Sequence, residues 1–229
     1  MEDETNEIWC LDDLSTGRME NIEHFLKDPR FTFLEQDVQK PVDLDVQQIY
    51  HAACPASPPA YQKDPVNTTK TCVLGTLNML ELARKYGAVL VNFSTSEVYG
   101  DPEAHPQRED YRGNVNPTGV RSCYDEGKRC AESLCFDYVR EYGTAVKVIR
   151  IFNTYGKKYG SGGRARGQQF YYSGVKGRRS DGIRRRLPDQ KLLPCGRSGG
   201  GNSAHDANAQ RSHRPVNLGT RRIYGARAR

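Results

Sequence analysis

The sequence has few hydrophobic residues, no long hydrophobic run and no paired cysteine motif. Hydrophobic residues make up 36% of the 229 residues, below the usual share for a globular chain. No stretch is long enough to cross a membrane, and the N-terminus lacks a signal-peptide pattern. The seven cysteines include no C-x-x-C pair and no regular spacing, which argues against a zinc site and a disulfide framework. We therefore expect reduced thiols, no metal, no membrane segment and a cytoplasmic location.

Charge is distributed unevenly along the chain. Residues 1–156 contain 16 Lys and Arg against 25 Asp and Glu, whereas residues 157–229 contain 18 against 3. The second segment is rich in Arg and Gly, and its large apolar side chains are too few to offset the entropy cost of ordering. We therefore predict a folded domain over residues 1–156 and a largely disordered basic tail over residues 157–229.

Polar residues that could take part in catalysis follow a predicted buried strand at residues 89–93. The next segment, residues 94–100, then lies at the carboxyl end of that strand, where open α/β sheets bind ligands. Tyr124 and Lys128 are four residues apart at the start of a predicted helix over residues 124–142, so they share one face. A nearby ammonium ion could lower the pKa of the phenol from about 10 towards the range of a general base. An ordinary amphipathic pair on a helix has the same spacing.

Three polar segments stand in a fixed order along the chain. They are Ser94-Thr95-Ser96-Glu97-Val98-Tyr99-Gly100, Ser122-Cys123-Tyr124-Asp125-Glu126-Gly127-Lys128-Arg129 and Arg150-Ile151-Phe152-Asn153-Thr154-Tyr155-Gly156. Together they resemble the extended short-chain dehydrogenase/reductase family that modifies nucleotide sugars. The proline-rich loop at residues 51–61 is most similar to that of UDP-glucuronate decarboxylases, and the resemblance covers about residues 8–156. It implies an α/β, Rossmann-like doubly wound parallel sheet, NAD as cofactor, a UDP-sugar substrate and a homodimer.

The resemblance implies NAD-dependent decarboxylation of UDP-glucuronate to UDP-xylose through a 4-keto intermediate. Thr95 would hold the C4 hydroxyl, Tyr124 would remove its proton, and Lys128 would lower the pKa of Tyr124 and bind the nicotinamide ribose. Glu97 would either assist proton handling at the sugar ring or only position its neighbours by hydrogen bonding. Ser96 stands where related dehydratases carry an acidic residue, which favours decarboxylation. A UDP-sugar 4-epimerase or a dTDP-glucose 4,6-dehydratase of the same family remains the alternative.

The resemblance also implies which residues bind cofactor and substrate. The cofactor residues would be Asp12, Asp13, Thr16, Gly17, Asp37, Val38, Ala52, Thr71, Phe93, Tyr124, Lys128 and Thr154. The substrate residues would be Lys70, Asn78 and Asn153. Apart from the resemblance, strand-end aspartates are common turn residues, and polar residues on a helix commonly form a solvated face.

No glycine precedes the first predicted strand, which runs over residues 8–11 and ends at Asp12. In a Rossmann unit a glycine-rich turn lies roughly 20 residues before such an acidic residue and places the cofactor pyrophosphate at a helix N-terminus. We therefore expect the fold to lack its first βα unit, and the chain as written to bind NAD poorly and to be inactive.

The remaining pattern of the first segment predicts alternating strands and helices. Further strands are expected over residues 31–38, 46–51 and 145–151, and a long helix over residues 65–85. His51 is expected to be a packed strand-end histidine. The loop over residues 101–121 would line the mouth of the substrate site. In the family, the helices that carry Asn78 and Tyr124 form the dimer interface.

The basic tail contains two islands that resemble the family: Phe170 with residues 175–177, and residues 215–219. One hypothesis is that the intervening sequence is translated out of frame or belongs to a faulty gene model. The other is that the chain is a non-enzymatic remnant whose basic tail attracts nucleic-acid phosphates. The tail lacks interleaved aromatic residues and any known binding motif, so we do not favour nucleic acid as a partner.

Overall fold

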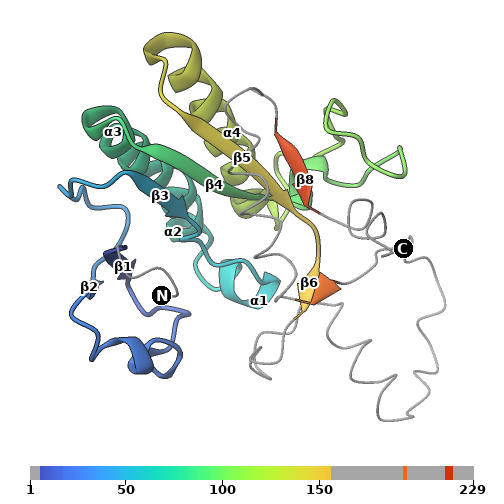
Figure 1. Ribbon diagram of the computed structural model, residues 1–229. Coiled ribbons are helices and arrows are strands. Elements are labelled where there is room, and N and C mark those ends of the chain that lie inside the picture. The colour runs from blue at the N-terminus through green and yellow to red at the C-terminus, as the bar shows by residue number, and fades with distance from the viewer. Residues whose placement is uncertain (1–5, 156–192, 195–214, 219–229) are drawn as a thin grey trace, which may run out of the picture.

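The computed structural model describes residues 6–155, 193–194 and 215–218 (Figure 1). Most of the predicted tail, including the island at Phe170 and residues 175–177, therefore lies outside the described residues. The described chain alternates strands and helices, which confirms the predicted α/β class. The strands are β1 (Ile8–Asp12), β2 (Phe31–Glu35), β3 (Gln48–His51), β4 (Val89–Thr95), β5 (Val146–Ile151), β6 (Thr154–Tyr155), β7 (Leu193–Pro194) and β8 (Val216–Leu218).

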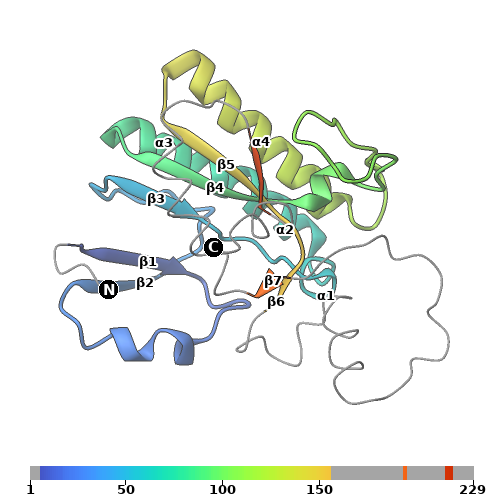
Figure 2. The same cartoon turned by 45° about the vertical axis from the view of Figure 1, so that its right-hand side comes forward.

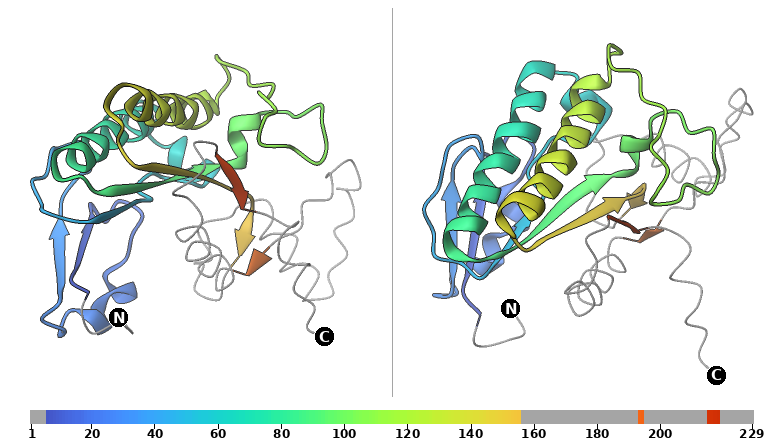
Figure 3. Two further views of the ribbon diagram at one scale, coloured as in Figure 1. Left: turned by 45° about the horizontal axis from the view of Figure 1, so that its top comes forward. Right: turned by 90° about the horizontal axis from the view of Figure 1, so that it is seen from above.

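Helices of three kinds connect these strands. The α-helices are α1 (Pro58–Tyr61), α2 (Pro65–Lys70), α3 (Thr76–Tyr86) and α4 (Ser122–Tyr142). Short 3-10 turns are η1 (Met19–Asn21), η2 (Glu23–Phe25) and η4 (Ser96–Tyr99), and a π-helical turn, η3 (Thr71–Gly75), joins α2 to α3. In Figure 3, α3 and α4 lie side by side across one face of the sheet that contains β3, β4 and β5.

The parallel sheet is divided into separate pieces. Strands β3, β4, β5 and β8 form one four-stranded parallel sheet, while β1 pairs with β2 in a second parallel sheet and β6 pairs with β7. Among the described residues no ladder joins β1 to β3, and Figure 2 shows the β1–β2 pair apart from the larger sheet. The Rossmann-like order is therefore present as two neighbouring sheets instead of one continuous sheet.

The main core lies between the four-stranded sheet and helices α3 and α4. Leu90 of β4, Leu80 and Ala83 of α3 and Cys135 of α4 are all 0% exposed. Alternate residues of a strand point to the same face. Leu90 therefore marks the face of β4 that packs against the helices. Leu77, Leu80, Leu82 and Ala83 of the predicted helix over residues 65–85 lie in this core and hold α3 on the sheet.

The helix predicted over residues 65–85 begins and ends close to its expected bounds. Asp64 caps its first turn, because its carboxylate accepts the Asn67 amide at 3.0 Å. Gly87 ends it with φ +66°, a conformation that glycine adopts without strain. The π-turn in its middle was not predicted.

The island predicted at residues 215–219 contains β8, which pairs in parallel with β5. The Asn217 side chain donates to the Gln107 carbonyl at 3.1 Å and accepts from the Tyr99 hydroxyl at 2.7 Å. This part of the second segment therefore joins the folded domain.

A buried ion pair joins α4 to the sheet. Arg150 of β5 donates to both carboxylate oxygens of Glu132 on α4, the shortest contact being 2.6 Å, and their side chains are only 12% and 9% exposed. Glu132 also accepts from Ser94 at 2.6 Å, and Arg150 donates to Tyr99 and to the Glu109 carbonyl. The guanidinium is therefore almost fully satisfied, and its hydrogen bonds to Glu132 help to raise its pKa although burial opposes this.

Replacing Glu132 with Ala should destabilise the fold strongly, because it leaves the Arg150 charge buried without its partner. We expect a loss of about 3 kcal/mol in the free energy of unfolding, measured by urea denaturation with circular dichroism. Glu126→Ala is the matched control, since it breaks an exposed ion pair with Arg129 on the same helix and should cost less than about 1 kcal/mol. Equal losses of unfolding free energy in the two variants would show that the buried pair stabilises the fold no more than the exposed pair does.

Candidate functional site

The four predicted catalytic residues lie on three elements, β4, η4 and α4, that meet at the carboxyl end of β4. Thr95 is the last residue of β4 and caps η4, where its hydroxyl accepts the Glu97 amide at 3.2 Å. Tyr124 and Lys128 occupy successive turns of α4, and both are buried, at 5% exposure each. Gly127 lets this helix approach η3 closely, because a Cβ there would lie 2.9 Å from the Cβ of Cys72.

Tyr124 is packed against a second tyrosine. The Tyr61 ring is stacked on it with centroids 4.9 Å apart and planes 2° from parallel. Burial raises the pKa of Tyr124, as does the charge of Cys54, while a hydrogen bond with Thr95 lowers it. The phenol therefore holds its proton in this structure, whereas the sequence led us to expect a lowered pKa.

Lys128 directs its ammonium group to the backbone of the neighbouring strand. Its Nζ donates to the Phe93 carbonyl at 2.9 Å. Phe93 was predicted to contact the cofactor, and here its carbonyl holds the lysine at the sheet edge. The catalytic roles of Thr95, Tyr124 and Lys128 stay predictions.

Glu97 is paired with Arg121, which immediately precedes α4. The Arg121 guanidinium also lies 3.9 Å from the Asp125 carboxylate. Burial raises the pKa of Asp125 to about 6, and the charge of Arg121 opposes this rise. Glu97 therefore belongs to a charged cluster beside Tyr124, which is compatible with either of the two roles considered for it.

The loop after β1 carries the first group of predicted cofactor residues. Asp12 accepts the Leu14 amide at 2.7 Å, and Asp13 accepts the Ser15 amide and hydroxyl at 3.0 and 2.6 Å. Gly17 lies against Asp12 so closely that a Cβ would be 2.8 Å from its Oδ1. Thr16 is exposed beside them.

A second group of predicted cofactor residues is joined by the Gln39 side chain. Its amide nitrogen donates to Asp37 at 3.1 Å, to Asn67 at 2.8 Å and to the Thr71 hydroxyl at 3.2 Å. The structure therefore brings Asp37 of the loop after β2 and Thr71 of η3 together. Val38 is 5% exposed and packs in the core.

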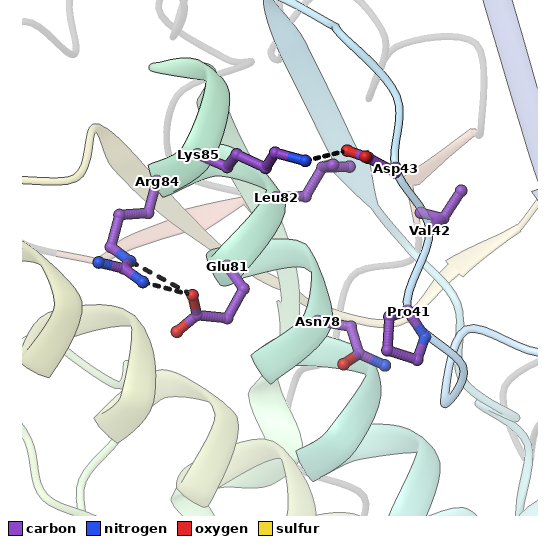
Figure 4. Close-up of a pocket in the computed structure, with 8 residues that line it drawn as sticks. All are labelled: Pro41, Val42, Asp43, Asn78, Glu81, Leu82, Arg84 and Lys85. Carbon is purple, nitrogen blue, oxygen red and sulfur yellow. Dashed lines mark hydrogen bonds and ion pairs between the residues drawn. The ribbon is translucent and has the colours of Figure 1, made fainter.

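Asn78 lies in a different place from the catalytic residues. Its amide donates to the Val38 carbonyl at 2.9 Å. It lines an open pocket of about 550 Å³ on the outer side of α3 (Figure 4). The Lys85–Asp43 and Arg84–Glu81 ion pairs border the same pocket. The structure therefore does not bring Asn78 to the Tyr124 site.

The remaining predicted binding residues lie on α2 and on the segments after β3 and β5. Lys70 and Ala52 are exposed, on α2 and on the loop after β3. Asn153 follows β5, and Thr154 begins β6, whose backbone pairs with β7.

Sequence analysis missed four side chains around Tyr124: Tyr61, Arg121, Cys54 and Cys72. Tyr61 ends the proline-rich loop, and its place at the end of that motif was an available signal. The cysteines are 18 residues apart and were considered only for regular spacing, although their Sγ atoms lie 3.2 Å from each other. In the described ranges, no three His, Cys, Asp or Glu side chains are grouped as metal ligands, and no helix combines the length and apolarity of a membrane span.

Comparisons with known proteins agree on the family. The model of the NAD dependent epimerase/dehydratase family matches residues 1–178. UDP-glucuronic acid decarboxylase 5 of Arabidopsis thaliana is 56% identical over 158 residues, which are 69% of this chain and 46% of that protein. UDP-glucuronic acid decarboxylase 1 of Danio rerio is 53% identical over 153 residues, or 67% of this chain and 37% of that protein. The chain thus spans less than half the length of these relatives.

A solved structure supports the same fold. A dTDP-glucose 4,6-dehydratase from Streptomyces venezuelae, solved with NAD bound, superposes with a TM-score of 0.72 at 22% identity. The match covers 96% of this chain and 68% of that structure. At this identity the likeness concerns the fold alone.

His51, at the end of β3, is a packed histidine as expected. It is 4% exposed, and its Nε2 lies 3.2 Å from the Thr76 hydroxyl. Burial, together with the charge of Lys128, lowers the pKa of His51 to about 3. The folded protein therefore keeps this imidazole neutral, while the unfolded chain protonates it below about pH 6.5.

Acid should therefore destabilise the wild-type protein more than a His51→Gln variant. Between the folded and unfolded pKa values only the unfolded chain binds the proton, so stability falls as the pH drops below about 6.5. From pH 7 to pH 5 we expect the wild type to lose about 2 kcal/mol more than the variant in urea denaturation. Thr76→Val removes the hydrogen bond but keeps the imidazole, so it should retain the wild-type pH dependence. Parallel curves for wild type and His51→Gln would contradict this account.

Proposed function

The chain belongs to the NAD dependent epimerase/dehydratase family, and we propose that its site serves the NAD-dependent decarboxylation of UDP-glucuronate to UDP-xylose. The observation that carries the proposal is the identity of 52–57% to UDP-glucuronic acid decarboxylases over a segment as long as the part that builds the site. Ser96 supports decarboxylation over dehydration, because loss of a hydroxyl from a sugar needs an acid and serine is a poor one. The proposal concerns the site in residues 6–155.

The side chains present fit NAD at two places. Asp12 stands at the carboxyl end of β1, and the absence of a Cβ at Gly17 leaves room beside its carboxylate. A carboxylate in this position suits the adjacent hydroxyls of a ribose. At the other end of the site, Lys128 and Tyr124 would hold the nicotinamide ribose by hydrogen bonds. The chemistry that NAD supplies when bound is acceptance and return of a hydride.

The residues of this chain would control the protons of the sugar. Thr95 and Tyr124 would bind the C4 hydroxyl, and Tyr124 would take its proton as C4 is oxidised. The ketone formed at C4 lies β to the carboxylate, so carbon dioxide can leave with its electrons delocalised onto the ketone oxygen. Because burial raises the pKa of Tyr124, proton transfer requires a nearby positive charge, and Lys128 is a buried cation on the same helix face. The Glu97–Arg121 pair would orient the sugar ring.

A chimera can test whether the site supports this reaction. Residues 6–155 of this chain would replace the aligned segment of the Arabidopsis UDP-glucuronic acid decarboxylase 5. With NAD⁺ and UDP-glucuronate we expect UDP-xylose, identified by mass spectrometry. Tyr124→Phe removes the transferable proton but keeps the ring, so it should lower the rate by about 10²-fold or more with little change in substrate affinity.

Tyr142→Phe is the matched control, since Tyr142 lies at the exposed end of α4 and its loss should leave the rate unchanged. A folded chimera that gives only the 4-epimer of UDP-glucuronate, or that acts only on dTDP-glucose, would assign the site to the epimerase or dehydratase reaction instead. Unchanged activity of Tyr124→Phe would exclude this residue as the base.

We also propose that the chain forms a homodimer through the helical layer. Val66 of α2 and Leu74 of η3 are 65% and 42% exposed, and burial of such side chains favours association. Light scattering after gel filtration should give twice the chain mass for the wild type and the chain mass for Leu74→Lys. Lys27→Glu, an exposed change in the segment between β1 and β2, is the control and should stay dimeric. A monomeric wild type would end this proposal.

A further inference from the structure

Two cysteines from different segments meet beside Tyr124. Cys54 belongs to the loop between β3 and α1, and Cys72 is the second residue of η3. Their Sγ atoms are 3.2 Å apart, within hydrogen-bond distance. The six cysteines in the described part of the chain are all free thiols.

The two thiols differ in exposure and acidity. Cys72 is 1% exposed, and its hydrogen bond with Cys54, together with burial, raises its pKa. Cys54 is only partly buried, and the same hydrogen bond lowers its pKa, as does the charge of Lys128. Cys54 is therefore the thiol that ionises and reacts first, and Cys72 stands ready as its resolving partner.

The local backbone allows the small approach that a disulfide needs. A disulfide bond is about 2.05 Å long, so the two sulfurs must move closer by little more than an ångström. Cys54 lies on a loop, and Cys72 lies in a π-turn, a helical form that is less regular than the α-helix and is frequent at functional sites.

We propose that Cys54 and Cys72 form a reversible disulfide beside Tyr124, with a small disulfide of the glutathione class as the oxidant. The Cys54 thiolate attacks one sulfur of the oxidant and releases its other half as a thiolate. Cys72 then loses its proton and attacks the Cys54 sulfur, which releases the second thiolate. The two cysteines lose two electrons in total, the oxidant gains them, and the two protein protons end on the two released thiols.

The disulfide would connect the redox state of the cell to this site. Cys54 and Cys72 pack in one cluster with Tyr61 and Tyr124, and the charge of Cys54 contributes to the raised pKa of Tyr124. The disulfide keeps Cys54 from ionising beside Tyr124 and ties the proline-rich loop to η3, which carries Thr71. The proposal does not depend on which nucleotide sugar the site binds.

The test uses the full chain, residues 1–229, equilibrated in buffers with increasing ratios of oxidised to reduced glutathione. After acid quenching and alkylation, trypsin separates Cys54 in peptide 31–63, Cys72 in peptide 71–84 and Cys123 in peptide 122–128. We expect mass spectrometry to find peptides 31–63 and 71–84 joined, on the order of tenfold more in the native chain than in guanidinium. Dithiothreitol should release them again.

Cys54→Ser and Cys72→Ser should each abolish the joined peptide, and Cys123→Ser should leave it unchanged. The comparison of native with guanidinium-unfolded wild type needs no variant, so a poorly folding serine variant leaves the test intact. The proposal is overturned if both cysteines stay alkylated at ratios that convert the exposed Cys130 to a mixed disulfide. Preferential joining of Cys54 to Cys123, or equal joining in guanidinium, would also overturn it.

Discussion

The buried Glu132–Arg150 ion pair is the contact on which the arrangement of the site depends. It joins α4 to β5, and through Ser94 and Tyr99 it reaches β4 and η4. Since Tyr124 and Lys128 are carried by α4 and Thr95 by β4, the same contact sets where the three side chains lie relative to one another. Tyr99 also donates to Asn217 of β8. The Glu132–Arg150 pair is therefore linked to a strand more than sixty residues further along the chain.

Local sequence patterns predicted the regular elements and the position of Tyr124 and Lys128 on one helix. Hydrophobic periodicity located β4, α4 and the helix from Pro65 onwards to within a few residues, because a buried stripe or strand leaves a clear signal. It could not predict the stacking of Tyr61 on Tyr124 or the approach of Cys54 to Cys72, since these contacts depend on how loops pack across elements. The division of the sheet between β1 and β3 agrees with the expectation that the first βα unit is lacking, because the strand of that unit lies centrally in a Rossmann sheet.

The site shows a tension between burial and acid/base chemistry. Burial positions Tyr124 firmly, with a stacked ring on one side and Thr95 close by, yet the same burial raises its pKa. A buried phenol is therefore well placed but stays protonated, and it cannot accept a proton unless nearby positive charge lowers its pKa. Lys128 is expected to supply that charge from the same helix, and in this structure its ammonium group donates to the Phe93 carbonyl of the sheet. The position of Tyr124 and its pKa are thus set by different neighbouring residues.

The π-turn η3 takes up one extra residue in the long helix. A π-turn accommodates one residue more than an α-helical turn of the same rise, so the helix keeps its phase on either side of it. Cys72 faces the proline-rich loop from within the turn, whereas Thr76 faces His51 just after it. Loss of one residue from this turn would therefore leave α3 in phase with α2 but change which side chain faces the proline-rich loop. A single-codon deletion here would alter the surroundings of Tyr124 while sparing the core.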